Sequence, residues 1–180
     1  PDSIIRYNNY PHQLSGGMRQ RITIAIALSC NPSLLIADEP TTSLDVTVQA
    51  QIFRLLLSLQ KKYKMSILII THDLGIISEI TKRLLIMYSG KIVEEGDTDE
   101  IFKNPMHPYT KALINCRPKL KGKIKSNMQV IGGTIPNLIN IDSKCSFYER
   151  CINQNKKCIN EPELIATKNK KHKVSCWYTN

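Results

Sequence analysis

The sequence predicts an α/β fold, in which a mostly parallel sheet with flanking helices is followed by a small irregular domain that contains cysteines. Two short apolar runs, residues 34–37 and 67–70, lie between amphipathic segments and each end in polar residues. Helices and strands that alternate in this way are typical of a parallel sheet. From about residue 103 onward, proline, glycine and lysine replace the apolar periodicity. We therefore expect two domains, residues 1–102 and 103–180.

Two helices are expected in the first domain. Ser15 can cap a helix that stops before Pro32, because a hydroxyl group ahead of an apolar periodic segment accepts a backbone N–H from the first turn. Asp45 can cap a second helix in the same way, and this helix fades at Lys62. The two apolar runs between and after these helices lack alternation, which fits strands buried on both faces of a parallel sheet.

Polar residues follow both predicted strands. Asp38 and Glu39 come after the first strand, and Thr71, His72 and Asp73 come after the second. The carboxyl ends of parallel strands meet at one edge of the sheet, where open α/β sheets bind ligands. We therefore expect the two polar groups to face the same ligand.

The chemistry of this edge is predicted to be phosphate hydrolysis. Two carboxylates at the end of a buried strand are costly unless a cation or polar groups compensate for the lost water. Mg²⁺ prefers oxygen ligands and shares them with waters and substrate phosphates, so Asp38 is the expected magnesium residue. Glu39 can polarise a water that attacks a γ-phosphate, and His72 can hydrogen-bond that phosphate or the water.

A hairpin and a short helix are expected beyond the second strand. Residues 84–88 and 91–94 flank a Ser-Gly pair, which is typical of a tight turn between antiparallel strands. Thr98 is expected to cap a short helix. Pro105 and Pro108 are expected to break the chain after it.

A second anion site is predicted at the start of the first helix. Ser15, Gly16 and Gly17 leave backbone N–H groups uncovered by side chains, and the positive end of the helix dipole adds to their attraction for phosphate. Ser-Gly-Gly alone could be only a flexible cap. The following Gln20, between two arginines, favours nucleotide binding.

The phosphate loop of nucleotide-binding proteins is missing from residues 1–180. Its G-x-x-x-x-G-K-[ST] pattern does not occur, because Lys91 and Lys123, which follow glycines, are each followed by isoleucine. We therefore expect these residues to be the C-terminal portion of a longer protein. Alone, they are expected not to hydrolyse ATP.

Positive charge is concentrated toward the C-terminus. The formal net charge is +10, and 15 of the 25 Lys and Arg but only 4 of the 15 Asp and Glu lie in residues 101–180. Such a segment can bind nucleic acid or an anionic membrane surface. Few aromatic residues lie between the lysines of this segment, which favours solvated loops near a membrane over a nucleic-acid site. The closely spaced lysines are Lys119, Lys121, Lys123, Lys125, Lys168, Lys170, Lys171 and Lys173. No apolar run reaches the about 20 residues of a membrane helix, so membrane contact is expected to be peripheral, through a partner.

Together these motifs carry a family resemblance. Residues 14–21 resemble the signature motif of ATP-binding-cassette (ABC) ATPases, residues 34–39 their Walker B strand, residues 43–45 their D-loop and His72 their switch histidine. In that family two cassettes dimerise head to tail. The resemblance implies that the signature of one chain completes the ATP site of its partner; the ATP-contacting residues carried over are Ser15, Gly16, Gly17, Gln20, Asp38 and Asp45, with Glu39 and His72 as the catalytic pair.

The C-terminal segment narrows the resemblance. Residues 104–113 are similar to the His-Pro-Tyr segment of ATPase subunits from dipeptide, oligopeptide and nickel importers, and Gly133-Thr134-Ile135-Pro136 and a group of cysteines follow in the expected order. The resemblance implies a subunit that hydrolyses ATP to power import. It also implies a second ABC ATPase subunit, two transmembrane permease subunits and, indirectly, an extracytoplasmic substrate-binding protein, with no nucleic acid. The chain would then lie peripherally on the cytoplasmic face of the membrane.

Four cysteines fall in the last 36 positions. Cys145, Cys151, Cys158 and Cys176 are separated by 5, 6 and 17 residues, and this spacing leaves an iron–sulfur cluster, zinc and free thiols open. Disulfides are rare in the cytosol, where a cassette ATPase works. The resemblance to importer ATPases favours a [4Fe–4S] cluster, which would tie together a tail that lacks a core of its own.

Two other functions compete with the importer. ATPases of the chromosome and repair class share the Ser-Gly-Gly signature, but they predict long coiled-coil heptads, and the sequence has none. A truncated remnant that binds without catalysis is the other alternative. Coding sequence upstream with a phosphate loop would favour the importer.

Overall fold

The structure is a computed structural model that describes residues 6–116, 131–134 and 143–178. It divides into two compact units, Pro1–Asp73 and Leu74–Asn180. The helices and strands follow one another in the order η1 (Pro11–Gln13), α2 (Gly16–Leu28), β1 (Leu34–Asp38), α3 (Val46–Tyr63), β2 (Ser66–Ile70), α4 (Leu74–Ile80), β3 (Arg83–Tyr88), β4 (Lys91–Asp97), α5 (Thr98–Lys103), α6 (Pro108–Asn115), η2 (Tyr148–Arg150), η3 (Lys156–Ile159), β5 (Ile165–Ala166) and β6 (Lys173–Val174).

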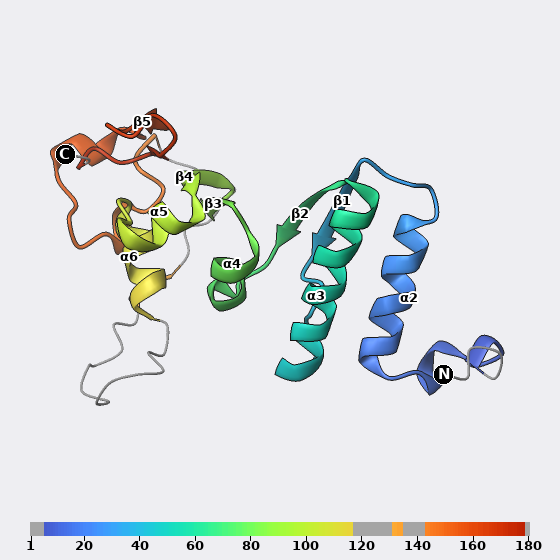
Figure 1. Cartoon of the computed structure of the whole chain (residues 1–180). Coiled ribbons are helices and arrows are strands. Elements are labelled where there is room, and N and C mark those ends of the chain that lie inside the picture. The colour runs from blue at the N-terminus through green and yellow to red at the C-terminus, as the bar shows by residue number, and fades with distance from the viewer. Residues whose placement is uncertain (1–5, 117–130, 135–142, 179–180) are drawn as a thin grey trace, which may run out of the picture. The chain divides into compact units, whose positions relative to one another are not determined.

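The N-terminal unit is built from two parallel strands and two helices. β1 and β2 pair from Leu34 opposite Ser66 to Asp38 opposite Ile70. α2 and α3 lie side by side, as Figure 1 shows in blue and blue-green. The buried apolar side chains of this unit are Ile24, Leu35, Ile52, Phe53, Leu56 and Met65.

Both helices of this unit begin where the sequence predicts. The Ser15 hydroxyl accepts the Met18 N–H at 3.4 Å, and Asp45 Oδ1 accepts the Val48 N–H at 2.9 Å. Each side chain satisfies one of the backbone donors that the first turn of a helix leaves unpaired. The predicted caps are therefore confirmed.

The expectation that both strands of this unit are buried on two faces is wrong for the described chain. Leu35 is 7% exposed, whereas its neighbour Ile36 on the other face of β1 is 59% exposed. Leu68 and Ile70 of β2 are exposed in the same way. Since successive side chains of a strand point to opposite faces, one face of the pair is covered and the other is open.

The C-terminal unit contains an antiparallel sheet with the strand order β3-β4-β6-β5. The predicted hairpin is confirmed: β3 and β4 pair across the turn at Ser89 and Gly90, whose φ angles are +47° and +77°. Such positive φ angles are what a two-residue hairpin turn requires. Among the described strands only β1 and β2 are therefore parallel, so the mostly parallel sheet expected from the sequence is not seen here.

An aromatic cluster forms the core of this unit. The Tyr88 ring contacts the Phe147 and Tyr109 rings edge-on, at centroid distances of 5.1 and 4.8 Å. Ile86 and Val93 of the hairpin are buried in the same cluster. The cluster joins the hairpin to α6 and to the segment around η2, which are distant in the sequence.

The starts of two helices in this unit differ from the sequence prediction. Thr98 is the first residue of α5, and Asp97 holds the cap position. Pro108 begins α6 instead of breaking the chain, because the first helical position needs no N–H donor and suits the fixed φ of proline.

The division into units falls earlier than the predicted domain boundary. β4 pairs with β6 at Glu94 opposite Val174, and this pairing groups the hairpin with the C-terminal segment. The boundary at 102/103 stays a prediction. Some residues of the predicted motifs lie outside the described residues, namely Lys119, Lys121, Lys123, Lys125, Ile135 and Pro136.

A helix that spans a membrane has to be both long and apolar. None of the helices within residues 6–116, 131–134 and 143–178 meets both requirements.

Candidate functional site

Glu39 and His72 meet at the carboxyl edge of the parallel strand pair. His72 Nδ1 lies 2.8 Å from Glu39 Oε1, and the His72 backbone N–H donates to the same oxygen at 3.2 Å. The Thr42 hydroxyl donates to Glu39 Oε2 at 3.1 Å. The structure thus brings together the two side chains that the sequence predicts as the catalytic pair.

The backbone holds Glu39 in an unusual conformation. Its φ angle is +45°, in the left-handed region that side chains other than glycine seldom adopt. Its N–H donates to the Ile70 carbonyl at 2.9 Å, so the ladder between β1 and β2 continues one residue past the strand. The strain is compatible with a functional position, because such conformations gather at active sites.

The contact between these side chains shifts both of their pKa values. The hydrogen bond to His72 is the main cause that lowers the pKa of Glu39, while partial loss of water acts in the opposite direction. The hydrogen bond to Glu39, followed by its negative charge, raises the pKa of His72. Each shift stabilises the charged form, so the pair favours carboxylate and imidazolium over a wider pH range than the isolated groups.

Asp38 lies at the end of β1 with its side chain exposed. The expected burial of two carboxylates at this strand end is therefore wrong for the described chain, since Glu39 is also only partly buried. An exposed carboxylate at a strand end can still supply an oxygen to Mg²⁺, which retains waters in its shell.

The start of α2 is closely packed against the segment that leads into α3. A Cβ atom on Gly16 would come within 2.9 Å of Leu44 Cδ2, and one on Gly17 would come within 2.7 Å of Val48 Cγ1. These distances are shorter than real contacts, so a side chain on Gly16 would require Leu44 to shift, and one on Gly17 would require Val48 to shift. The sequence predicts glycine here for anion binding, and this packing role was missed.

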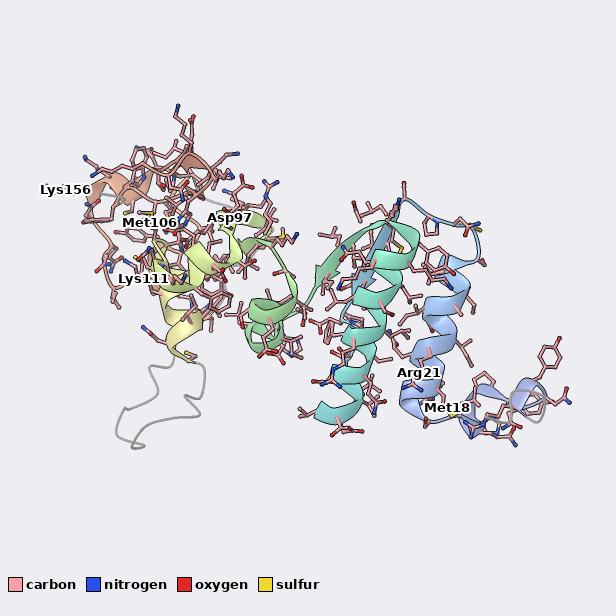
Figure 2. The ribbon with its side chains drawn as sticks, viewed as in Figure 1. Met18, Arg21, Asp97, Met106, Lys111 and Lys156 are labelled. Carbon is pink, nitrogen blue, oxygen red and sulfur yellow. The ribbon has the colours of Figure 1, made fainter. Side chains whose placement is uncertain are left out.

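The other predicted ATP-contacting residues have local contacts. Asp45 caps α3, as described above. Gln20 is half-buried on α2, one residue before Arg21, whose guanidinium donates to Gln51 of α3 at 2.8 Å. Figure 2 labels Met18 and Arg21 on this helix.

A pocket in the C-terminal unit gathers the four predicted metal ligands. Its lining contains the cysteines together with aromatic and proline side chains; its residues are His107, Pro108, Cys145, Phe147, Tyr148, Cys151, Cys158, Pro162, Cys176, Trp177 and Tyr178. The Cys145 N–H donates to the Cys158 carbonyl at 2.9 Å, which ties two of the cysteine-bearing loops together.

The cysteines of this pocket are not arranged around one metal ion. No three His, Cys, Asp or Glu side chains of the described residues stand close enough to share an ion. Burial raises the pKa of Cys145 to about 11 and also raises the pKa values of Cys151 and Cys176. The metal site predicted at the cysteines is thus not supported by this arrangement and stays a prediction.

A buried carboxylate that sequence reasoning missed lies beside this pocket. Glu94 is 0% exposed, and its Oε1 accepts hydrogen bonds from His172 Nε2 at 2.7 Å and from the Met106 N–H at 2.8 Å. Its Oε2 accepts the His107 N–H at 2.9 Å. The only sequence signal is a glutamate that follows the apolar pair 92–93 in a strand, which does not identify its partners.

Two protein families match the sequence. Residues 2–42 match the family described as ABC transporter, and residues 93–158 match the family described as oligopeptide/dipeptide transporter, C-terminal region. The second match contains three of the four pocket cysteines.

Curated relatives match nearly all of the chain. The oligopeptide transport ATP-binding protein AppD of Bacillus subtilis is 51% identical over 160 residues, which are 88% of this chain and 48% of that protein. The dipeptide transport ATP-binding protein DppD of Haemophilus influenzae is 49% identical over 165 residues, 91% of this chain and 50% of that protein. The chain thus spans about half the length of the curated relatives it matches.

Solved structures share the fold. A nucleotide-free ATP-binding cassette from an ABC transporter has a TM-score of 0.53 and 30% sequence identity, and the match covers 59% of this chain and 42% of that one. The ATP-binding cassette MJ1267 of an ABC transporter has a TM-score of 0.52 at 28% identity, with the same coverage.

Proposed function

Because the chain belongs to the ABC transporter family and carries the C-terminal region of its oligopeptide and dipeptide transporters, we propose that it is part of the ATP-hydrolysing subunit of a peptide importer. The direct contact between Glu39 and His72 at the edge of the parallel strand pair carries this proposal. A carboxylate and an imidazole at one strand edge can orient a water and a phosphate at the same time.

The two side chains have separate roles in this proposal. Glu39 accepts a proton from the attacking water, and its lowered pKa keeps it ionised. His72 donates a hydrogen bond to the terminal phosphate, and its raised pKa favours the charged ring. Asp38, exposed at the end of β1, would hold Mg²⁺, which neutralises phosphate charge when it is bound.

The start of α2 serves a second nucleotide site. Ser15, Gly16 and Gly17 present N–H groups at a helix N-terminus, where phosphate is favoured. Two such chains, or this chain and a sister subunit, would each complete the ATP site of the other. Together they would drive two permease subunits from the cytoplasmic face of the membrane.

ATP hydrolysis by the whole gene product tests the catalytic pair. Glu39→Gln is expected to lower kcat at least about 100-fold, the usual loss when a general base is removed. His72→Ala is expected to lower kcat similarly. Glu79→Gln makes the same charge change on the exposed surface of α4 and should leave kcat unchanged. Full activity of Glu39→Gln would refute the assignment, and turnover by residues 1–180 alone would refute the need for a phosphate loop.

For the cysteine pocket we propose a [4Fe–4S] cluster. All four thiols line one pocket, together with aromatic side chains. A zinc ion would need every thiolate sulfur at about 2.3 Å from the zinc. A cluster takes one thiolate for each of its four irons, so the four sulfurs can lie farther apart around a pocket. The cluster would bind Cys145, Cys151, Cys158 and Cys176 and would stabilise the loops that carry them.

Metal analysis after purification without oxygen tests the cluster. Iron and acid-labile sulfide are expected in equal amounts, and both should be lost in Cys151→Ser. Cys30→Ser, in the N-terminal unit, serves as the control and should retain both. Zinc in place of iron would refute the cluster.

A further inference from the structure

The Thr42 hydroxyl holds one oxygen of the Glu39 carboxylate and has no role in the proposals above. It donates to Glu39 Oε2 at 3.1 Å. The other oxygen, Oε1, accepts the His72 backbone N–H at 3.2 Å and lies 2.8 Å from His72 Nδ1. An ionised carboxylate can only accept hydrogen bonds, so the imidazole nitrogen and the hydroxyl are both donors here. The Glu39 side chain is therefore held through both of its oxygens.

The two oxygens of Glu39 differ in how many of their acceptor sites are filled. Each oxygen of a carboxylate has about two lone-pair sites. Both sites of Oε1 are filled by donors of His72. Of the described residues only Thr42 donates to Oε2, which leaves this oxygen one site for a water molecule. A general base needs such a site within hydrogen-bond reach of the proton that it accepts.

The turn that carries Thr42 is fixed to α3 by its backbone. Thr41 is 6% exposed, and its carbonyl accepts the Gln49 side-chain amide at 3.3 Å and the Leu44 N–H at 3.2 Å. The Thr42 N–H donates to the Glu39 carbonyl at 3.2 Å. These hydrogen bonds give the Thr42 hydroxyl a defined position beside the carboxylate, although its side chain is exposed.

We propose that Thr42 is a positioning residue for ATP hydrolysis, whose hydroxyl orients Glu39 so that the free site of Oε2 faces the attacking water. This inference rests on the function proposed above, in which Glu39 is the general base. The water oxygen forms its bond to the γ-phosphorus, the bond to the ADP oxygen breaks, and the water proton passes to Oε2. Without the Thr42 hydroxyl the carboxylate is held through Oε1 alone and can rotate, and small errors of position at a reacting centre lower the rate strongly.

Steady-state ATP hydrolysis by the whole gene product tests this role. Thr42→Val removes the hydroxyl and is expected to lower kcat about tenfold while changing KM for ATP less than about twofold, because Glu39 acts in the chemical step. Thr42→Ser keeps the hydroxyl and should restore kcat to within about twofold of wild type. Thr23→Val is the matched control and should leave kcat unchanged. It removes an exposed hydroxyl that donates to the Arg19 carbonyl at 3.1 Å within α2.

A double-mutant cycle with Glu39→Gln distinguishes positioning from a general effect on the loop. In the Glu39→Gln background, Thr42→Val should lower the residual kcat by less than about twofold, because no carboxylate is left to orient. An equal loss in both backgrounds would overturn the inference, since Thr42 would then act independently of Glu39. If Glu39→Gln leaves no measurable rate, the comparison of Thr42→Val with Thr42→Ser decides.

The remaining outcomes also decide for or against Thr42. An unchanged kcat in Thr42→Val would overturn the inference, and so would a loss of the same size in Thr42→Ser. If Thr42→Val does not fold, Thr42→Ala removes the same hydroxyl without a methyl group in its place and is compared with Thr42→Ser instead. Full activity of Glu39→Gln would overturn the proposed function itself, whereas a slow Glu39→Gln with a fast Thr42→Val would overturn only the role of Thr42.

Discussion

The two units of the chain differ in how completely their side chains are buried. The N-terminal unit has long regular helices and a parallel strand pair, yet Ile36 and other aliphatic side chains of that pair are exposed. The C-terminal unit has short helices and irregular loops, yet it buries Glu94 completely and His172 to 1% exposure. Long regular helices and strands therefore do not by themselves ensure that the apolar side chains of a unit are buried.

The difference comes from the kind of contact that each unit uses. Helices and strands of the N-terminal unit form from local sequence, but the unit itself leaves part of their apolar faces exposed. In the C-terminal unit the Glu94 carboxylate binds groups from two other segments, the backbone N–H groups of Met106 and His107 and the side chain of His172. Hydrogen bonds between distant segments can hold together a chain that lacks large aliphatic faces.

The largest effect is expected from removing the buried carboxylate. Glu94→Ala leaves His172 and two backbone N–H groups without their acceptor, and breaking a buried pair costs about 3–5 kcal/mol. Guanidinium unfolding, with limited proteolysis of the C-terminal unit, measures this loss. The exposed Glu79→Ala in the same unit should change stability by less than about 0.5 kcal/mol. Equal stability of the two variants would mean that the network does not hold the unit together.

The open strand face is tested by neighbouring residues on β1. Leu35→Ala removes a buried side chain and should cost about 2–5 kcal/mol in free energy of unfolding. Ile36→Ala changes an exposed side chain and should cost less than about 0.5 kcal/mol in the isolated chain. If both substitutions lower the free energy of unfolding of residues 1–180 equally, the face of β1 that carries Ile36 is not open. A large cost of Ile36→Ala in the whole gene product alone would mean that other parts of that protein cover this face.

The close packing at the start of α2 should have an intermediate effect. Gly17→Ala places a methyl group against Val48 and should destabilise the chain by about 1–3 kcal/mol. The double variant Gly17→Ala with Val48→Ala should recover part of this loss, because the second change makes room for the first. Gly132→Ala meets nothing within 4 Å and is the control. Thermal unfolding measures this loss. An unchanged melting temperature in Gly17→Ala would mean that Gly17 has no packing role.

The smallest effect concerns the pH dependence of the exposed Glu39–His72 pair. The pKa of His72 lies above its usual value of 6.5, and Glu39→Gln should return it toward that value, as proton NMR titration of the ring can follow. The stabilisation from the raised pKa is complete below 6.5 and disappears as pH rises through the folded pKa of His72. The contribution of Glu39 is present above its usual pKa of 4.5 and disappears as pH falls through its lowered folded pKa. Asp73→Asn should shift His72 less, and an unshifted pKa in Glu39→Gln would mean that the contact is absent in solution.

Local features of the fold could be predicted well from the sequence. The caps at Ser15 and Asp45 and the hairpin at Ser89 depend on residues a few positions apart. The meeting of Glu39 and His72 follows from two strands that end at one sheet edge. Pro108 was misread because a proline can either stop a helix or begin one, and only the following packing decides between them.

The sequence by itself determined where α2, α3 and the hairpin turn begin, which polar residues follow the parallel strands, and that four cysteines lie in one segment, because these properties depend on local backbone preferences and spacing. Only the tertiary structure decided that one strand face stays open, that Gly17 lies against Val48, and that Glu94 binds His172, 78 positions away. Those outcomes depend on which distant surfaces meet, and no local pattern specifies that meeting. The position of His107 in the pocket wall has the same origin, since Glu94 holds its backbone from a distant strand.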